Sequence, residues 1–226
     1  MAETTITVQG EFAAWYPAER ATVTASVLTD GPDRDEVFAR AVEASDALRN
    51  LIMSIHDKNV GPITWWSSDS VRVWSARPWN NQGEQLELVF HAGVDFSAKF
   101  SDFDALARWV ESAAGIHGVT VSSIEWALTD ATRTSATVEV RSRAVKDAVA
   151  KATVFAQSIG LGSVTAIALA DPGMLGDLSG GGGSQSGYTR ASMSSMVVGG
   201  AGDPQLALKP EEIAVESMVD ARFIAK

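Results

Sequence analysis

The side chains that could carry chemistry are few in this sequence, and their spacing assembles no catalytic motif. The chain has no cysteine, which excludes thiolate nucleophiles, disulfides and cysteine-ligated zinc. Its three histidines, His56, His91 and His117, never pair at a metal-ligand spacing, so surface or core positions are the better interpretation. No G-x-S-x-G motif marks a nucleophilic serine. We therefore expect no catalytic residues, no metal and no cofactor.

Two further features invite a chemical interpretation and do not support one. Residues 180–183 are four glycines followed by Ser184, but a phosphate-binding loop needs a Lys and a Ser or Thr after its last glycine, between a strand and a helix. The carboxylate pairs Asp33/Asp35 and Glu211/Glu212 suit helix caps and turns better than acid–base catalysis. Neither feature predicts an active site.

Tryptophan is the exception, because four of the seven tryptophans fall between residues 65 and 79. On one unbulged strand, Trp66 and Trp74 share one face and Trp65 and Trp79 share the other, so neither face is simply solvated. Three interpretations remain open. The cluster could be a core packed on both faces, a subunit interface, in which tryptophan is enriched, or a platform that stacks on a sugar or another flat small molecule. With few basic residues nearby, nucleic acid is the least favoured ligand.

Charge and composition also limit the partners. The chain has 226 residues, a formal net charge of −10 and 46% hydrophobic residues, which is typical of a globular protein. The acidic balance opposes binding to nucleic acid or to an anionic membrane surface. No apolar run approaches the ~18 residues of a membrane span, so we expect a soluble protein.

The N-terminal residues bear on where in the cell the protein is located. Residues 1–5 have no basic segment and no apolar segment follows them, so the pattern of a secretory signal is missing. Met1-Ala2-Glu3 is typical of a native start, which predicts a cytoplasmic protein. The alternative is a periplasmic or cell-envelope protein whose signal peptide has been removed.

Hydrophobic periodicity predicts the α+β class, with one antiparallel or mixed sheet of about seven strands and three helices in the order ββαββαβαββ. The helices are expected from a cap at Asp33 to about residue 55, from a cap at Ser101 or Asp102 to Gly115, and from about residue 130 or 132 to 161. The strands are expected at residues 5–15, 20–29, 63–79, 84–100, 119–128, 163–170 and 213–224.

The clearest helix covers residues 141–161, and the other elements are expected to pack around it. Its apolar positions recur at spacings of four, four, three and four, which places them on one face: Ala144, Ala148, Ala152, Phe155 and Ile159. Arg143, Asp147 and Lys151 form ion pairs on another face, worth a few tenths of a kcal/mol at most. Gly160 can adopt the left-handed conformation that ends the helix.

Three segments, in order along nearly the whole chain, carry a resemblance to a known family: residues 6–11 with 17 and 20–23, the pattern Ala144-x-x-Asp147-Ala148-x-x-Lys151-Ala152 with 159–162, and residues 208–213 with 215 and 219. They resemble the opening hairpin, long helix and closing strand of the SIMPL-domain family, which is bacterial, largely periplasmic or envelope-associated, and includes immunogenic antigens. The resemblance also favours helix over strand at residues 136–140, where propensity alone suits a strand.

The resemblance implies ring- or channel-like homo-oligomers linked to stress tolerance, with no catalytic residues to carry over. We expect one domain over residues 1–226, with a projecting tryptophan-rich hairpin at 63–100 and a flexible Gly/Ser/Met-rich insertion at 171–210. The leading hypothesis is a non-enzymatic structural or interaction protein that pairs with itself and forms a ring, channel or cage. The alternative is a small-molecule binding module built from the hairpin and the Gly-rich segment. Either contact would use Trp65, Trp66, Trp74, Trp79, Met193 and Met196.

Overall fold

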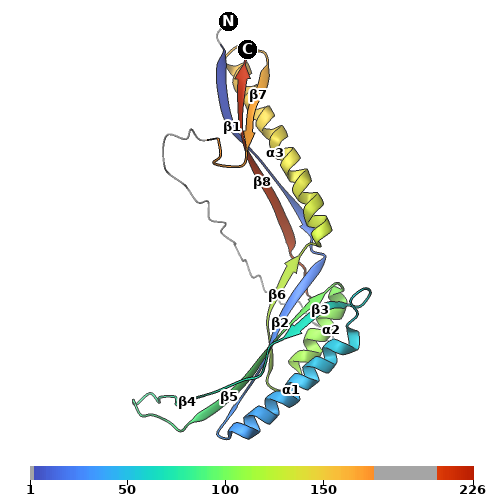
Figure 1. Cartoon of the computed structure of the whole chain (residues 1–226), viewed down its shortest axis with the longest axis vertical. Coiled ribbons are helices and arrows are strands. Elements are labelled where there is room, and N and C mark those ends of the chain that lie inside the picture. Colours follow the sequence, from blue (N-terminus) through green and yellow to red (C-terminus); the bar gives the residue numbers. More distant parts are fainter. Residues whose placement is uncertain (1–2, 176–207) are drawn as a thin grey trace, which may run out of the picture. The chain divides into compact units, whose positions relative to one another are not determined.

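The computed structural model describes residues 3–175 and 208–226, which divide into two compact units. The terminal unit comprises described residues 3–16, 129–175 and 212–226, and the central unit comprises residues 17–128 and 208–211. Each unit has its own antiparallel sheet and its own helical cover (Figure 1). The α+β class is therefore confirmed. That residues 1–226 act as one domain stays a prediction.

The central unit is a five-stranded sheet in the order β3-β5-β2-β6, with β4 also paired to β5. Its strands are β2 (Arg20–Gly31), β3 (Ile63–Ser68), β4 (Arg72–Ala76), β5 (Val89–Phe100) and β6 (Val119–Ala127). β2 and β5 pair over their full length, from Ala21 opposite Phe100 to Gly31 opposite Phe90. Alternation decides the faces, because Ala21, Val23, Ala25 and Val27 are buried while the threonines between them are only half-buried.

Two helices, α1 (Arg34–Ile55) and α2 (Phe103–Ala114), cover one face of this sheet (Figure 1). Both begin at an aspartate, since the carboxylates of Asp33 and Asp102 each accept two backbone N–H groups from the first turn. The predicted caps are therefore correct. The face of α1 that packs on the sheet is buried at Val37, Ala41, Ala44, Ser45, Leu48 and Ile52.

The terminal unit is a three-stranded sheet in the order β1-β8-β7, with α3 (Asp130–Ser158) along one face (Figure 1). Its strands are β1 (Thr4–Pro17), β7 (Val164–Ala170) and β8 (Glu212–Ala225). Residues from β1, β8 and α3 form its buried core: Ile6, Val8, Ala148, Ala152, Ala156, Ala221, Phe223 and Ala225. The helical prediction for 136–140 is confirmed, because burial in this unit overrides the local strand propensity.

The buried face of α3 differs from the expected one at its C-terminal end. The buried positions recur every four residues from Ala136 to Ala156, whereas Phe155 and Ile159 are 54% and 58% exposed, so their prediction as core residues was wrong. A four-residue period exceeds the 3.6-residue turn, so the contact stripe winds around the helix as α3 follows the sheet. Gly160 ends the helix as predicted, at φ 80°, with the Leu161 N–H bonded to the Ala156 carbonyl.

Two other expectations need correction. β1 and β2 are consecutive strands but belong to different sheets, so they do not form an opening hairpin. The strand expected at 63–79 is two strands, β3 and β4, which gives eight strands in the order ββαβββαβαββ. The strand expected from residue 84 begins at Val89, and Leu86 is exposed.

Most of the expected insertion at 171–210 lies outside the described residues, and Met193 and Met196 lie there too. In the parts of the chain that the structure describes, no helix combines the length and apolar character needed to cross a membrane.

Candidate functional site

The tryptophan-rich hairpin contains an irregularity that decides which faces its side chains occupy. Ser68 of β3 lies opposite Phe96 of β5, yet Arg72, four residues later, lies opposite Gly93, only three residues earlier. One extra residue therefore sits between β3 and β4, and an odd shift reverses the faces of the residues that follow.

This reversal makes the predicted pairing of the tryptophans wrong. Trp66 lies opposite Ala98 on the buried face and packs against the central core. Trp65 lies opposite Lys99 and Trp74 opposite His91, so these two indoles share the outer face, which α1 and α2 do not cover. Trp79 lies beyond β4, where it forms an isolated bridge with Gln85.

Trp74 is an exposed indole that its neighbours hold in a defined orientation. Its ring stacks on that of His91, with ring centroids 5.4 Å apart and planes 19° apart. Gly93 lies beneath the indole, since a Cβ there would sit 3.4 Å from its edge. The glycine lets the ring lie close to the sheet, yet 45% of Trp74 stays exposed.

Polar groups flank this stack on the same face. Arg72 forms an ion pair with Asp95, and the Ser26 hydroxyl donates a hydrogen bond to the same carboxylate at 2.6 Å. The pair is surface-exposed, so it contributes ~1 kcal/mol or less to stability. Its main effect is to hold a guanidinium and a carboxylate beside the indole.

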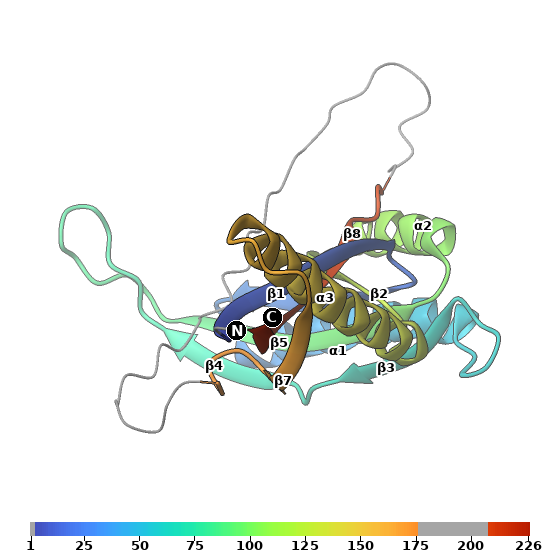
Figure 2. The same ribbon diagram turned by 90° about the horizontal axis from the view of Figure 1, so that it is seen from above.

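Trp65, the other exposed indole on the outer face of the sheet, does not form one patch with Trp74. Lys99 and His91 are eight residues apart on β5, which places Trp65 about 26 Å from Trp74 along the strand. Trp65 instead has the Lys99 ammonium 6.0 Å from its ring centre. Trp79 is 66% exposed on the loop that joins β4 and β5, which extends beyond α1 and α2 in both views (Figures 1 and 2).

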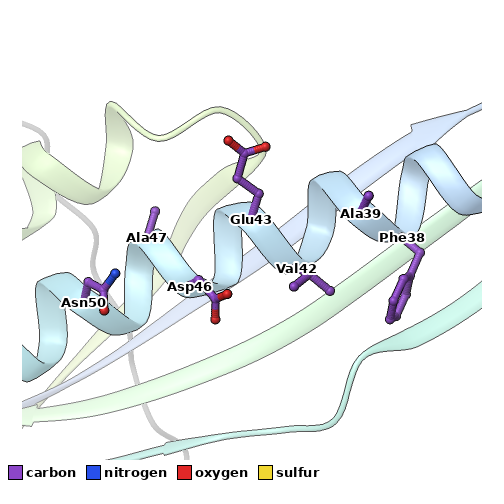
Figure 3. A pocket seen from close by; sticks show the side chains of 7 residues that line it. All are labelled: Phe38, Ala39, Val42, Glu43, Asp46, Ala47 and Asn50. Carbon is purple, nitrogen blue, oxygen red and sulfur yellow. The ribbon is translucent and has the colours of Figure 1, made fainter.

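A shallow depression of about 650 Å³ lies on the outward face of α1 (Figure 3). Phe38 and Val42 supply its apolar surface, and Glu43, Asp46 and Asn50 supply its polar atoms. Sequence reasoning missed this feature because it followed only the buried stripe of the helix. The size suits a small ligand, but its polar groups do not converge as they do in most binding pockets.

The four-residue spacing of Asp147 and Lys151 in α3 has a structural explanation. Their side chains pair at 2.8 Å, and both also bind β1. Asp147 accepts the Glu11 N–H at 2.9 Å, and Lys151 donates to the Gln9 carbonyl at 3.1 Å. These side chains were expected to form only surface ion pairs. They instead satisfy backbone groups of β1, and we call this arrangement the Asp147–Lys151 clasp.

The clasp shifts the titration of both groups. The Lys151 ammonium and the Glu11 N–H lower the pKa of Asp147, and the Asp147 carboxylate raises the pKa of Lys151. Each shift favours the charged form, so both groups are held as an ion pair across the neutral range. This role is structural, because neither group is aimed at a site for a reacting molecule.

Gly10, between the two clasped residues, allows β1 to approach α3 closely. A Cβ at this position would lie 2.1 Å from the Ala144 carbonyl oxygen and 2.7 Å from the Ala148 nitrogen. A glycine within a strand pattern is a sequence signal for such an approach. The signal could have been read together with the Ala-rich face of α3.

The described residues do not form a metal centre. Residues 3–175 and 208–226 contain no group of three or more His, Asp or Glu side chains arranged to hold a metal ion. Within the same ranges, His56 binds the Ile63 carbonyl and His91 stacks on Trp74.

The protein is of the α+β class, with two antiparallel sheets that each have helical cover on one face. The Asp147–Lys151 clasp and Gly10 hold β1 close to α3. The chain belongs to the SIMPL family, described as proteins of unknown function (DUF541), whose model matches residues 6–223. The predicted resemblance is therefore confirmed over nearly the whole chain. A comparison with curated proteins gave no match.

Proposed function

We propose that the protein is a non-enzymatic structural or interaction protein that assembles with copies of itself through the β4–β5 hairpin. The observation that carries the proposal is the exposure of two indoles, Trp74 at 45% and Trp79 at 66%, on one hairpin. Exposed apolar clusters on a folded chain mark contact surfaces, and tryptophan dominates the energetics of many interfaces.

The expected strength follows from the exposed area. With ~200 Å² for a whole tryptophan side chain, 45% of Trp74 and 66% of Trp79 give ~220 Å² per copy. Covering that area on two copies contributes ~11 kcal/mol at ~25 cal/mol per Å². Association costs ~4–15 kcal/mol, so the two terms nearly balance. We therefore expect assembly that depends on protein concentration and uses further contacts.

Closed symmetry of the ring, channel or cage type suits this surface, because it lets every copy cover the same residues. The acidic net charge of −10 favours contacts through uncharged surfaces such as the indoles. The stress-related role rests on the family resemblance alone, and the cytoplasmic location stays a prediction.

Light scattering on the intact chain and on Trp74→Ser/Trp79→Ser tests the proposal. The intact protein is expected to gain mass with concentration, and the double variant is expected to remain smaller. Trp66→Ser is an unsuitable control because Trp66 packs in the core, whereas Trp65→Ser removes an exposed indole ~26 Å away and should change little. A monodisperse monomer at every concentration contradicts the proposal.

The Trp74–His91 stack also supports a second candidate, a small-molecule binding module. A half-exposed indole beside the Arg72–Asp95 pair offers a flat apolar face and hydrogen-bonding groups together, as a sugar ring would require. Titration of the intact protein with sugars, followed by tryptophan fluorescence, tests it. A change that disappears in Trp74→Ser but persists in Trp65→Ser supports binding here, and unchanged fluorescence contradicts it.

A further inference from the structure

The edge of β1 is protected by side chains over only part of its length. β1 is an end strand of the β1-β8-β7 sheet, so alternate backbone groups point away from β8. Gln9 and Glu11 are such positions, and the clasp of Lys151 and Asp147 occupies their carbonyl and N–H. Because this direction repeats every second residue, Thr5 and Thr7 also present their backbone groups at this edge.

The unclasped part of this edge lacks the usual protection against strand pairing. Proteins shield exposed edges with charged side chains, prolines or bulges. Residues 4–8 read Thr-Thr-Ile-Thr-Val, which are all β-branched and uncharged. By contrast the central strand of the sheet, β8, carries charges at Glu212, Glu216, Asp220 and Arg222.

An apolar flank accompanies this open segment. On α3, the contacts with the β1 edge follow at a spacing of four residues, with Asp147 at Glu11 and then Lys151 at Gln9. Phe155 and Ile159 continue this four-residue spacing past the clasp, in the direction of Thr7 and Thr5. Both are more than half exposed, at 54% and 58%, so the side chains that follow the clasp are apolar and uncovered.

We propose that the edge of β1 over residues 4–8 pairs with the same segment of a second copy of this chain. The pairing is antiparallel about a two-fold axis at Ile6, with Thr5 opposite Thr7 of the second copy. This inference rests on the proposed self-assembly and assigns it a second contact surface, which the marginal indole contact requires. Unpaired backbone groups specify an extended strand as the occupant.

The choice of a second copy follows from symmetry and charge. In this register Thr4 meets Val8 and Glu3 meets Gln9, so no like charges lie opposite one another. A two-fold contact also brings the Phe155 and Ile159 side chains of both copies to the same junction. The clasp stops the pairing at Gln9, which limits slippage of the register.

The experiment combines sedimentation with amide hydrogen exchange of the full chain over a range of concentrations. The N–H groups of Thr5 and Thr7 are expected to exchange at least about tenfold more slowly in the assembled protein than at high dilution. Thr7→Pro removes an edge donor without removing a bond to β8, so it should lower the assembled mass. Thr7→Val keeps the N–H and the β-branched shape, and it should behave like the intact chain.

Phe155→Ser/Ile159→Ser changes only exposed side chains and decides the matter if Thr7→Pro does not fold. This variant should also assemble less. Assembly with fast exchange at Thr5 and Thr7 overturns the edge contact but leaves the proposed function standing. A monomer at every concentration overturns both. If the N–H groups of Thr5 and Thr7 exchange slowly even in a monomer at high dilution, the contact between copies is also overturned. The chain would then cover the edge of its own β1.

Discussion

Replacing Gly10 with alanine tests the close approach of β1 to α3. The new Cβ would lie 2.1 Å from the Ala144 carbonyl oxygen, whereas ordinary contact begins at 3.4 Å, so strand and helix must separate by 3.4 − 2.1 = 1.3 Å. A gap of ~0.5–1 Å already removes a quarter to a half of a dispersion contact. The obstructing atoms are the Ala144 carbonyl oxygen, the Ala148 nitrogen and the Ala148 Cβ, none of which a side-chain rotation can move, so the overlap is not relieved that way.

The expected loss of stability follows from the contacts between β1 and α3. Ile6 and Val8 are buried against α3, and burial of each contributes ~1.5–3 kcal/mol, of which about half would be lost. The Asp147 bond to the Glu11 N–H contributes ~0.5–1.5 kcal/mol and would stretch, as would the Lys151 bond to the Gln9 carbonyl. Reduced entropy of the unfolded chain offsets only ~0.4–1 kcal/mol. The net destabilisation is ~3 kcal/mol, a large share of the ~5–15 kcal/mol of a typical fold.

Thermal unfolding followed by circular dichroism measures this loss. At ~2–4 °C per kcal/mol for a chain of this length, Gly10→Ala should lower Tm by ~10 °C. Gly162→Ala is the matched control, because the nearest atom to its new Cβ is the Lys226 carbonyl oxygen at 3.9 Å. The control should stay within ~2 °C of the intact protein. Equal Tm values for the two variants would refute the close approach of β1 to α3.

Three further predictions concern the same unit and the proposed lack of catalysis. Ala148→Asp places a carboxylate in the buried core and should unfold the protein or make it insoluble, which circular dichroism and solubility measure. Asp147→Asn should lower Tm most above the ordinary carboxyl pKa of 3.8, and the gap should close as pH falls through the lowered pKa, because acid protonates Asp147 in the intact protein; a constant gap contradicts this. A broad hydrolase and oxidoreductase screen should give no turnover, and activity lost on one polar substitution overturns the non-enzymatic proposal.

Local features could be predicted from the sequence because their causes lie within a few residues. Asp33 and Asp102 cap helices through N–H groups two and three residues ahead, and Gly160 ends α3 through its own backbone conformation. Family membership followed from such segments in order, even though no single one is distinctive.

The candidate surface could be predicted only in part. The clustering of tryptophans marked the hairpin, but the extra residue between Ser68 and Arg72 placed Trp74 on the face opposite Trp66. No local pattern marks that residue, because register depends on the partner strand β5. The outward depression at Phe38 and Val42 was missed for a related reason, since exposure depends on what packs against a helix.

The sequence by itself determined the α+β class, the helix ends and the lack of cysteine chemistry, because propensity, capping and composition act locally. Tertiary structure alone decided that β1 and β2 enter different sheets, that Ala156 and not Phe155 is buried, and that Asp147 and Lys151 bind the backbone of β1. Each of these depends on an element distant in sequence. A helix period of 3.6 or a strand period of 2 specifies faces, and only the packed partner specifies which face is covered.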